Sequence, residues 1–234
     1  NLNFSLGIAV SYLSFINFSL PLIVYSCSIP VTLLVTWYWL YRKICFQQAV
    51  LPFQFRLGDF SRKFSNDDAV NKTICEQIID LCQKNTTGKH YLVFGKPGTQ
   101  KTSLGVGMAT EWTFNKGIAR YTTYFKLLQL LPNASEPVVQ DGRKVWPWRY
   151  ADMLIVDDVN PGIDPVSPAS CANSRPDCLK NCLQNLGNSS ENLKLLKEKT
   201  TVWIIGDVQN QGDWSNAFAS LGFPAQDIII LNIL

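Results

Sequence analysis

Charged residues are missing from the first part of the chain. Residues 1–41 contain no Asp, Glu, Lys or Arg, whereas the whole sequence of 234 residues has a formal net charge of +3. This uncharged run is far longer than the roughly 20 apolar residues that cross a bilayer as a helix. It is also too long for a signal peptide and has no basic start. We therefore expect a membrane segment, and the buried hairpin of a soluble protein is the weaker alternative.

Other absences narrow the chemistry. Histidine occurs once, at His90, so a Ser–His or Cys–His mechanism would depend on that residue alone. The seven cysteines are an odd number without paired spacing and do not indicate a disulfide framework. Cys171, Cys178 and Cys182 have no fourth cysteine and no histidine nearby, so packing on a helix is a simpler interpretation than zinc binding. The small net charge does not by itself indicate nucleic-acid binding.

A proline divides the uncharged segment. The stretches on either side of Pro21 each approach the length of a membrane-spanning helix, so either two helices form a hairpin or residues 22–41 span alone. The far end holds a cluster of aromatic residues followed by two cations, among them Trp37, Trp39, Tyr41, Arg42 and Lys43. Such an aromatic belt followed by positive charges normally faces the cytoplasm. We expect residues 1–43 to be a membrane anchor of one or two helices, with the rest of the chain on the cytoplasmic side.

The most informative stretch is a short apolar run that leads into a loop containing glycine. Residues 91–94, Tyr-Leu-Val-Phe, are typical of a strand, and an apolar segment typical of a helix follows the loop. The loop and the first helical residues are Gly95, Lys96, Pro97, Gly98, Thr99, Gln100, Lys101, Thr102 and Ser103. Glycines let backbone N–H groups surround a phosphate, while a lysine and a hydroxyl supply charge and a Mg²⁺ ligand. The pattern predicts a nucleotide-phosphate site, with an ordinary strand-to-helix turn as the alternative.

One residue departs from the usual phosphate-loop pattern. Glycine normally stands directly before the lysine, and this chain has Gln100 there. A side chain at this position is expected to narrow the loop or to shift its backbone. Gln100 is therefore the residue on which two hypotheses differ: an active enzyme, or a protein that kept the fold and lost its activity.

Two later stretches supply polar residues at strand ends. A continuous apolar run ends in Asp157 and Asp158, as expected for a buried parallel strand that delivers carboxylates to the carboxyl edge of a sheet. Asp157 is expected to hold Mg²⁺ through water, and Asp158 to position or deprotonate the attacking water. Asp207 and Asn210 follow the next strand and are candidates for sensing the γ-phosphate, although an ordinary turn fits them equally well.

The remaining pattern predicts alternating strands and helices. Strands are expected at residues 90–94, 118–123, 151–158, 200–205 and 228–231. Helices are expected at residues 67–84, 102–116, 124–131, 178–187, 189–199 and 213–221. Residues 132–150 and 159–176 are rich in polar residues and proline and are expected to be loops. Trp146 and Trp148 in the first of these are expected to cap the core of the domain, with stacking on a base or a partner as the alternative.

The loop and the acidic strand together resemble the AAA+ and superfamily 3 group of P-loop ATPases. Residues 95–102, Gly-Lys-Pro-Gly-Thr-Gln-Lys-Thr, are similar to their phosphate loop, and residues 154–158, Leu-Ile-Val-Asp-Asp, to their acidic strand. Helicase loaders and transposase helpers share the approach to the acids at residues 149–152 and the strand at residues 121–123. Membrane-associated helicases of picorna-like viruses share the Asp-Asp-Val-Asn sequence at residues 157–160. Both subgroups fit equally.

The resemblance implies a fold, a cofactor and a set of partners. The fold is a three-layer α/β P-loop NTPase with a mostly parallel sheet at residues 67–234, after a linker at residues 44–66. The implied function is a membrane-anchored ATPase that binds ATP and Mg²⁺, contacts phosphate through Lys101, and works as an oligomeric remodelling or translocation motor. No helical lid follows the last strand, which favours a structural subunit without turnover as the alternative. The third functional hypothesis is a nucleic-acid helicase, for which nucleic acid would be a partner.

Overall fold

A computed structural model describes residues 28–59, 87–115, 117–133, 137–140, 142–159, 175–185, 189–206 and 211–233. The chain divides into two compact units, Asn1–Ile44 and Cys45–Leu234. The helix predicted at residues 67–84, and the candidates Asp207 and Asn210, lie outside the described residues.

The described part of the first unit is a helix. Residues 28–44 are helical throughout, and their apolar side chains are exposed, as at Leu34 and Trp37. The Arg42 guanidinium lies 5.0 Å from the centre of the Tyr38 ring. Among the residues with described positions, no helix is both long enough and apolar enough to cross a membrane. Residues 1–27, the larger part of the predicted anchor, are outside that set.

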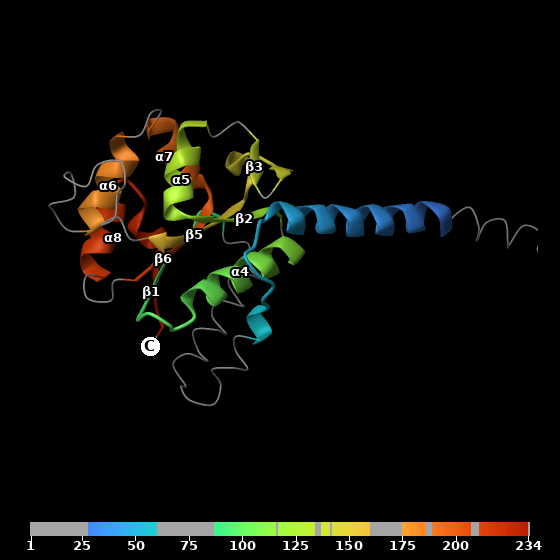
Figure 1. Cartoon of the computed structure of the whole chain (residues 1–234), viewed down its shortest axis with the longest axis horizontal. Coiled ribbons are helices and arrows are strands. Elements are labelled where there is room, and N and C mark those ends of the chain that lie inside the picture. The colour runs from blue at the N-terminus through green and yellow to red at the C-terminus, as the bar shows by residue number, and fades with distance from the viewer. Residues whose placement is uncertain are drawn as a thin grey trace, which may run out of the picture. The chain divides into compact units, whose positions relative to one another are not determined.

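The second unit is built on a 5-stranded sheet (Figure 1). Its strands are β1 (His90–Gly95), β2 (Ala119–Thr123), β5 (Met153–Val159), β6 (Thr200–Ile205) and β7 (Ile228–Ile233). They lie in the order β2-β5-β6-β1-β7, and every neighbouring pair is parallel. Strands β1 and β6 are buried along their whole length, in keeping with their continuous apolar and β-branched sequences. The α/β fold with a parallel sheet that the sequence predicts is confirmed.

Helices cover both faces of the sheet and give three layers. On one face α4 (Lys101–Asn115) packs through Leu104, Met108 and Trp112 onto Ile155 and Ile204. The other face carries α5 (Tyr124–Leu130), α6 (Arg175–Asn185), α7 (Ser189–Glu198) and α8 (Gln211–Ser220), which close a second core. Figure 1 shows α4 apart from these helices. Short 3-10 turns, η1 (Leu131–Asn133), η2 (Trp148–Tyr150) and η3 (Ala225–Asp227), complete the unit.

The prediction of a loop at residues 132–150 was wrong in part. Strand β3 (Val138–Gln140) pairs antiparallel with β4 (Arg143–Val145), and Gly142 between them has a φ of 72°. The two strands are too short to show a periodic pattern, although Asp-Gly at 141–142 is a known hairpin signal. Trp148 does cap the core, because it is 2% exposed and its indole N–H donates to the Leu130 carbonyl at 3.3 Å.

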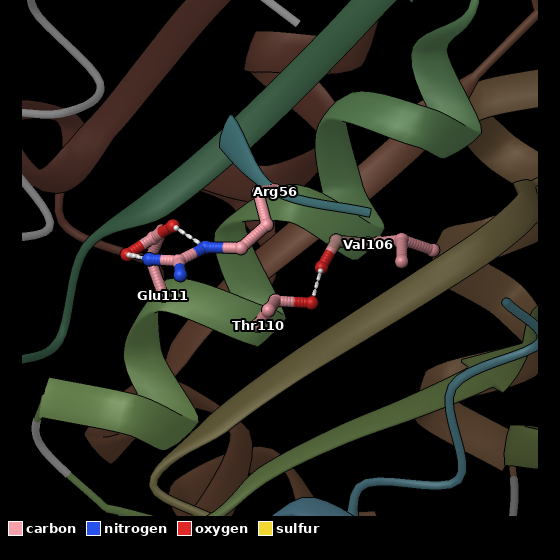
Figure 2. Close-up of polar contacts among 4 residues, drawn as sticks. All are labelled: Arg56, Val106, Thr110 and Glu111. Carbon is pink, nitrogen blue, oxygen red and sulfur yellow. Dashed lines mark hydrogen bonds and ion pairs between the residues drawn. The ribbon is translucent and has the colours of Figure 1, made fainter. Parts of the chain in front are cut away.

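Residues 45–59, expected as part of a linker, pack against the sheet domain and belong to the second unit. We call this segment the strap. Leu57 is 1% exposed and lies against Gly107 of α4. The Ala49 carbonyl accepts a hydrogen bond from the Tyr121 N–H at 2.9 Å. Figure 2 shows the Arg56 guanidinium facing the carboxylate of Glu111 on α4, with N–O distances of 3.1 and 3.4 Å.

Candidate nucleotide site

The loop between β1 and α4 turns tightly over the end of the sheet. A side chain at Gly95 would place its Cβ 2.6 Å from the Thr99 hydroxyl and 2.6 Å from the Ile233 carbonyl, so only glycine fits. Gly98 has a φ of 85°, which is the left-handed region that glycine adopts without strain. The two glycines thus have separate roles, since one gives room for a close approach and the other allows the turn.

Gln100 adopts the backbone conformation expected of a glycine. Its φ is 60°, in the left-handed region, which costs an L-residue roughly 1–2 kcal/mol. The Gln100 carbonyl still accepts the N–H of Leu104 at 3.1 Å, so the first turn of α4 is intact. The loop therefore keeps a glycine-type path through Gln100, and local strain accompanies it.

The Lys101 side chain turns back into the loop. Its ammonium donates to the carbonyls of Gly95 at 2.8 Å and Lys96 at 2.6 Å, and it lies 3.5 Å from the Thr99 hydroxyl. Burial lowers the pKa of Lys101, while the nearby Asp157 carboxylate raises it. A cation is thus held at the centre of the loop, where an anion that entered the turn would meet it.

Asp157 lies at the end of β5 with donors on both of its oxygens. Asp157 is 3% exposed. The Tyr121 hydroxyl donates to its Oδ2 at 2.7 Å, and the Asp158 N–H donates to its Oδ1 at 2.8 Å. A buried carboxylate is stable only when such donors compensate for its lost hydration. The position and the orientation of Asp157 are therefore both fixed.

A β-bulge presents the second acid. Val156 pairs with Trp203 and Val159 with Ile205, so two residues of β5 stand opposite one residue of β6. Asp158 is the exposed residue of this bulge and has a φ of 53°. Partial desolvation of its carboxyl, followed by the adjacent Asp157 charge, raises the pKa of Asp158. A carboxylate with a raised pKa is a stronger proton acceptor than an ordinary surface aspartate.

Sheet order brings the loop and the acids to one edge. Strand β6 is the single strand between β1, which carries the loop, and β5, which carries the acids. The carboxyl ends of parallel strands meet at the same edge, where ligands of open α/β sheets bind. Asp207 and Asn210 follow β6 in the sequence, and their proposed role stays a prediction because they lie outside the described residues.

The residues of this edge fit a nucleotide phosphate and a magnesium ion. The glycine-lined turn holds the Lys101 ammonium at its centre, where a bound phosphate would replace the loop carbonyls as its partner, and Thr102 and Ser103 lie half-buried in the first turn of α4. Within the described part of the chain, no three His, Cys, Asp or Glu side chains converge on a metal site. Mg²⁺ does not need such a cluster, since it is usually held by one or two protein groups together with phosphate and water.

Tyr121 was not predicted as a site residue. Its hydroxyl reaches Asp157 from β2, and 36 positions separate the two residues in the sequence. No local pattern indicates this contact, because it depends on which strands pair and in which register. Tyr121 stands in the strand that the sequence predicts and in the stretch at residues 121–123 noted for its resemblance, and neither signal indicates a contact with Asp157.

No protein-family model matches the sequence, and no curated protein matches it. Solved structures to which the chain is similar include the two that follow. The crystal structure of DnaI has 13% identity and a TM-score of 0.46, with 82% of this chain and 90% of that chain covered. The crystal structure of the DnaC helicase loader has 16% identity and a TM-score of 0.43, with 72% and 92% covered.

Proposed function

We propose that the second unit binds Mg²⁺–ATP in the loop between β1 and α4 and hydrolyses it. The observation that carries this proposal is that one edge of the sheet holds both the Lys101 ammonium, inside a glycine-lined turn, and the buried Asp157 carboxylate at the end of the second strand along. Lys101 contacts the β- and γ-phosphates, and the N–H groups of residues 98–102 surround them. Thr102 and Asp157 hold Mg²⁺, which neutralises phosphate charge when bound.

Asp158 has a separate role in hydrolysis. It orients the attacking water and accepts its proton, which its raised pKa and its exposure at the bulge support. Asp158→Asn is a clean test, because asparagine has the same shape and tolerates the left-handed conformation that Asp158 adopts. The variant should bind Mg²⁺–ATP like the wild type and lose most of its hydrolysis.

The experiment measures ATP binding to the full chain by titration calorimetry, with Mg²⁺ and with EDTA. Lys101→Ala should abolish binding, whereas Lys194→Ala, which removes an exposed lysine from the middle of α7, should leave it unchanged. Absence of Mg²⁺-dependent binding in the wild type, or full binding by Lys101→Ala, would refute the proposal.

A second candidate is a nucleotide-binding subunit without turnover, which the strained Gln100 favours. Under this alternative the wild type binds Mg²⁺–ATP, and no hydrolysis depends on Asp158. A measured turnover that Asp158→Asn removes would exclude the alternative. Binding with no turnover above that of Asp158→Asn would support it.

We also propose that the protein works at a membrane, with the second unit on the cytoplasmic side. The helix at residues 28–48 supports this, because Leu33, Leu34 and Trp37 in its first-unit part are 65%, 68% and 71% exposed. The full chain should float with anionic lipid vesicles in a density gradient. Leu33→Asp with Trp37→Asp should weaken flotation, and Val139→Asp, an exposed apolar site of the second unit, should not. Equal flotation of all three proteins would contradict the proposal.

We propose that the protein acts as a motor after further copies of the chain assemble with it, and that nucleic acid is a second partner if it is a helicase. Light scattering should detect an oligomer that forms with Mg²⁺–ATP and not with EDTA. Single-stranded RNA or DNA should stimulate hydrolysis at low salt if the helicase alternative holds. A chain that stays monomeric with Mg²⁺–ATP would contradict the motor role, and lack of any nucleic-acid effect would contradict the helicase.

A further inference from the structure

Tyr121 connects the edge strand β2 to the acid at the end of β5. In the strand register Tyr121 pairs with Ile155, and Thr123 pairs with Asp157. The Tyr121 side chain therefore starts beside Ile155 and extends along β5 by two positions to the Asp157 carboxylate. Its hydroxyl donates to that carboxylate at 2.7 Å. A side chain as short as threonine or serine at this position could not span that diagonal.

Three separate contacts fix Tyr121 in place. Its backbone N–H donates to the Ala49 carbonyl of the strap at 2.9 Å, and its ring packs against the core beneath α4. Its hydroxyl is bonded to Asp157. The phenol is the donor in this contact, because an ionised carboxylate oxygen can only accept.

The Asp157 carboxylate therefore cannot rotate freely. The Tyr121 hydroxyl occupies one side of Oδ2 and the Asp158 N–H occupies one side of Oδ1. Each carboxylate oxygen can accept more than one bond, so the remaining lone pairs point in directions that these two donors determine. The Asp158 N–H comes from the same strand end, whereas Tyr121 is an independent support from another strand.

From this arrangement we infer that Tyr121 is a positioning residue that orients Asp157 toward the magnesium ion of the nucleotide site. The inference rests on the proposed function and adds to it a residue outside both sequence patterns. Carboxylates that bind metals are usually held by such outer hydrogen bonds, and loss of one typically costs 10–100-fold in metal affinity. The competing explanation is that the hydrogen bond only ties together two strands that already pair.

Tyr121→Phe separates the two explanations, because it removes the hydroxyl and keeps the ring. ATP binding to the full chain is titrated with Mg²⁺, and the Mg²⁺ concentration at half-maximal binding is compared with that of the wild type. We expect a rise of about tenfold or more. Binding of ATP in EDTA should stay the same, since the loop residues are unchanged. Tyr150→Phe is the matched control, because that ring is exposed, and it should leave the Mg²⁺ requirement unchanged.

A double substitution tests whether the effect passes through Asp157. If Tyr121 acts by orienting that carboxylate, Tyr121→Phe should change the Mg²⁺ requirement by less than about twofold in an Asp157→Asn background. A full tenfold change in that background would overturn the inference. The midpoint of thermal unfolding, measured without nucleotide or metal, reports any general loss of stability.

The outcomes also separate this inference from the proposed function. If the wild type binds Mg²⁺–ATP and Tyr121→Phe has the same Mg²⁺ requirement, the role of Tyr121 is overturned and the proposed function is not. A lowered unfolding midpoint of Tyr121→Phe would then show that the hydrogen bond serves stability. A wild type that binds no Mg²⁺–ATP overturns the proposed function and this inference together.

Discussion

Nδ1 of His90 lies 2.7 Å from the hydroxyl of Thr201, and neither residue has any exposed surface. The two residues pair between β1 and β6. The Phe223 ring stands edge-on to the imidazole at 4.6 Å, and the Trp203 indole N–H donates to the same hydroxyl at 2.9 Å. The single histidine of the chain is thus a core residue and lies away from the loop and the acids.

This burial predicts that stability depends on pH. Loss of hydration lowers the pKa of His90 from 6.5 to about 4, and the nearby Asp227 opposes the shift. Between these values the unfolded chain binds a proton that the folded protein does not, so the stability present above pH 6.5 is lost as the pH falls toward 4. The loss attributable to His90 should be about 3 kcal/mol.

Urea unfolding of the wild type and of His90→Gln at pH 7 and pH 4.5 measures this effect. The wild type should lose more stability than the variant on acidification, whatever the absolute stability of the variant at pH 7. An equal loss in both proteins would show that other groups cause the acid sensitivity.

Gln100→Gly should be neutral or stabilising. The substitution removes the cost of a left-handed φ at a non-glycine residue, roughly 1–2 kcal/mol, and adds about 0.4–1 kcal/mol of entropy to the unfolded chain. The expected net gain in the free energy of unfolding is between zero and about 1.5 kcal/mol. Gln100→Val should lose stability, because a β-branched residue rarely adopts this conformation. A clear loss in Gln100→Gly would mean that the glutamine side chain stabilises the loop.

Gly105→Ala should be destabilising even though alanine is the better helix former. A Cβ at this position would lie 2.7 Å from Cδ1 of Ile204 and 3.0 Å from Cγ2 of Ile155, so α4 would have to move away from the sheet. We expect a loss of about 1–3 kcal/mol. Gly107→Ala, whose nearest neighbour is Leu57 at 3.4 Å, serves as the control and should lose less. Similar losses at both positions would argue against close packing at Gly105.

Leu57→Ala and Arg56→Ala should differ strongly, although both remove contacts between the strap and α4. Leu57 is 1% exposed, and its truncation should cost about 2–5 kcal/mol in the free energy of unfolding. The Arg56 side chain is 62% exposed, so its ion pair with Glu111 should contribute less than about 1 kcal/mol. Comparable losses would indicate that the ion pair, and not the buried leucine, holds the strap.

The sequence predicted those parts of the site that local patterns encode. Gly95, Gly98 and Lys101 follow one strand, Asp157 and Asp158 end another, and spacing alone indicates both stretches. Contacts between distant strands could not be predicted in this way. The Tyr121 hydroxyl meets Asp157 only because β2 lies beside β5 in one particular register.

The strap shows the same limit. Leu57 stands in a stretch without periodicity, and its burial depends on the space that Gly107 leaves on α4. The left-handed conformation of Gln100 was also not predicted, because the sequence shows that a glycine is absent and does not show which backbone the replacement adopts.

The order of strands in the sheet has a consequence for how the protein is made. In the described sheet both neighbours of β1 come later in the chain, and the paired residues His90 and Thr201 are 111 positions apart. A ribosome therefore completes β1 and the loop that follows it long before either pairing strand emerges. Such non-local pairing slows folding, and the apolar strand stays exposed to chaperones and to other chains until β6 and β7 arrive.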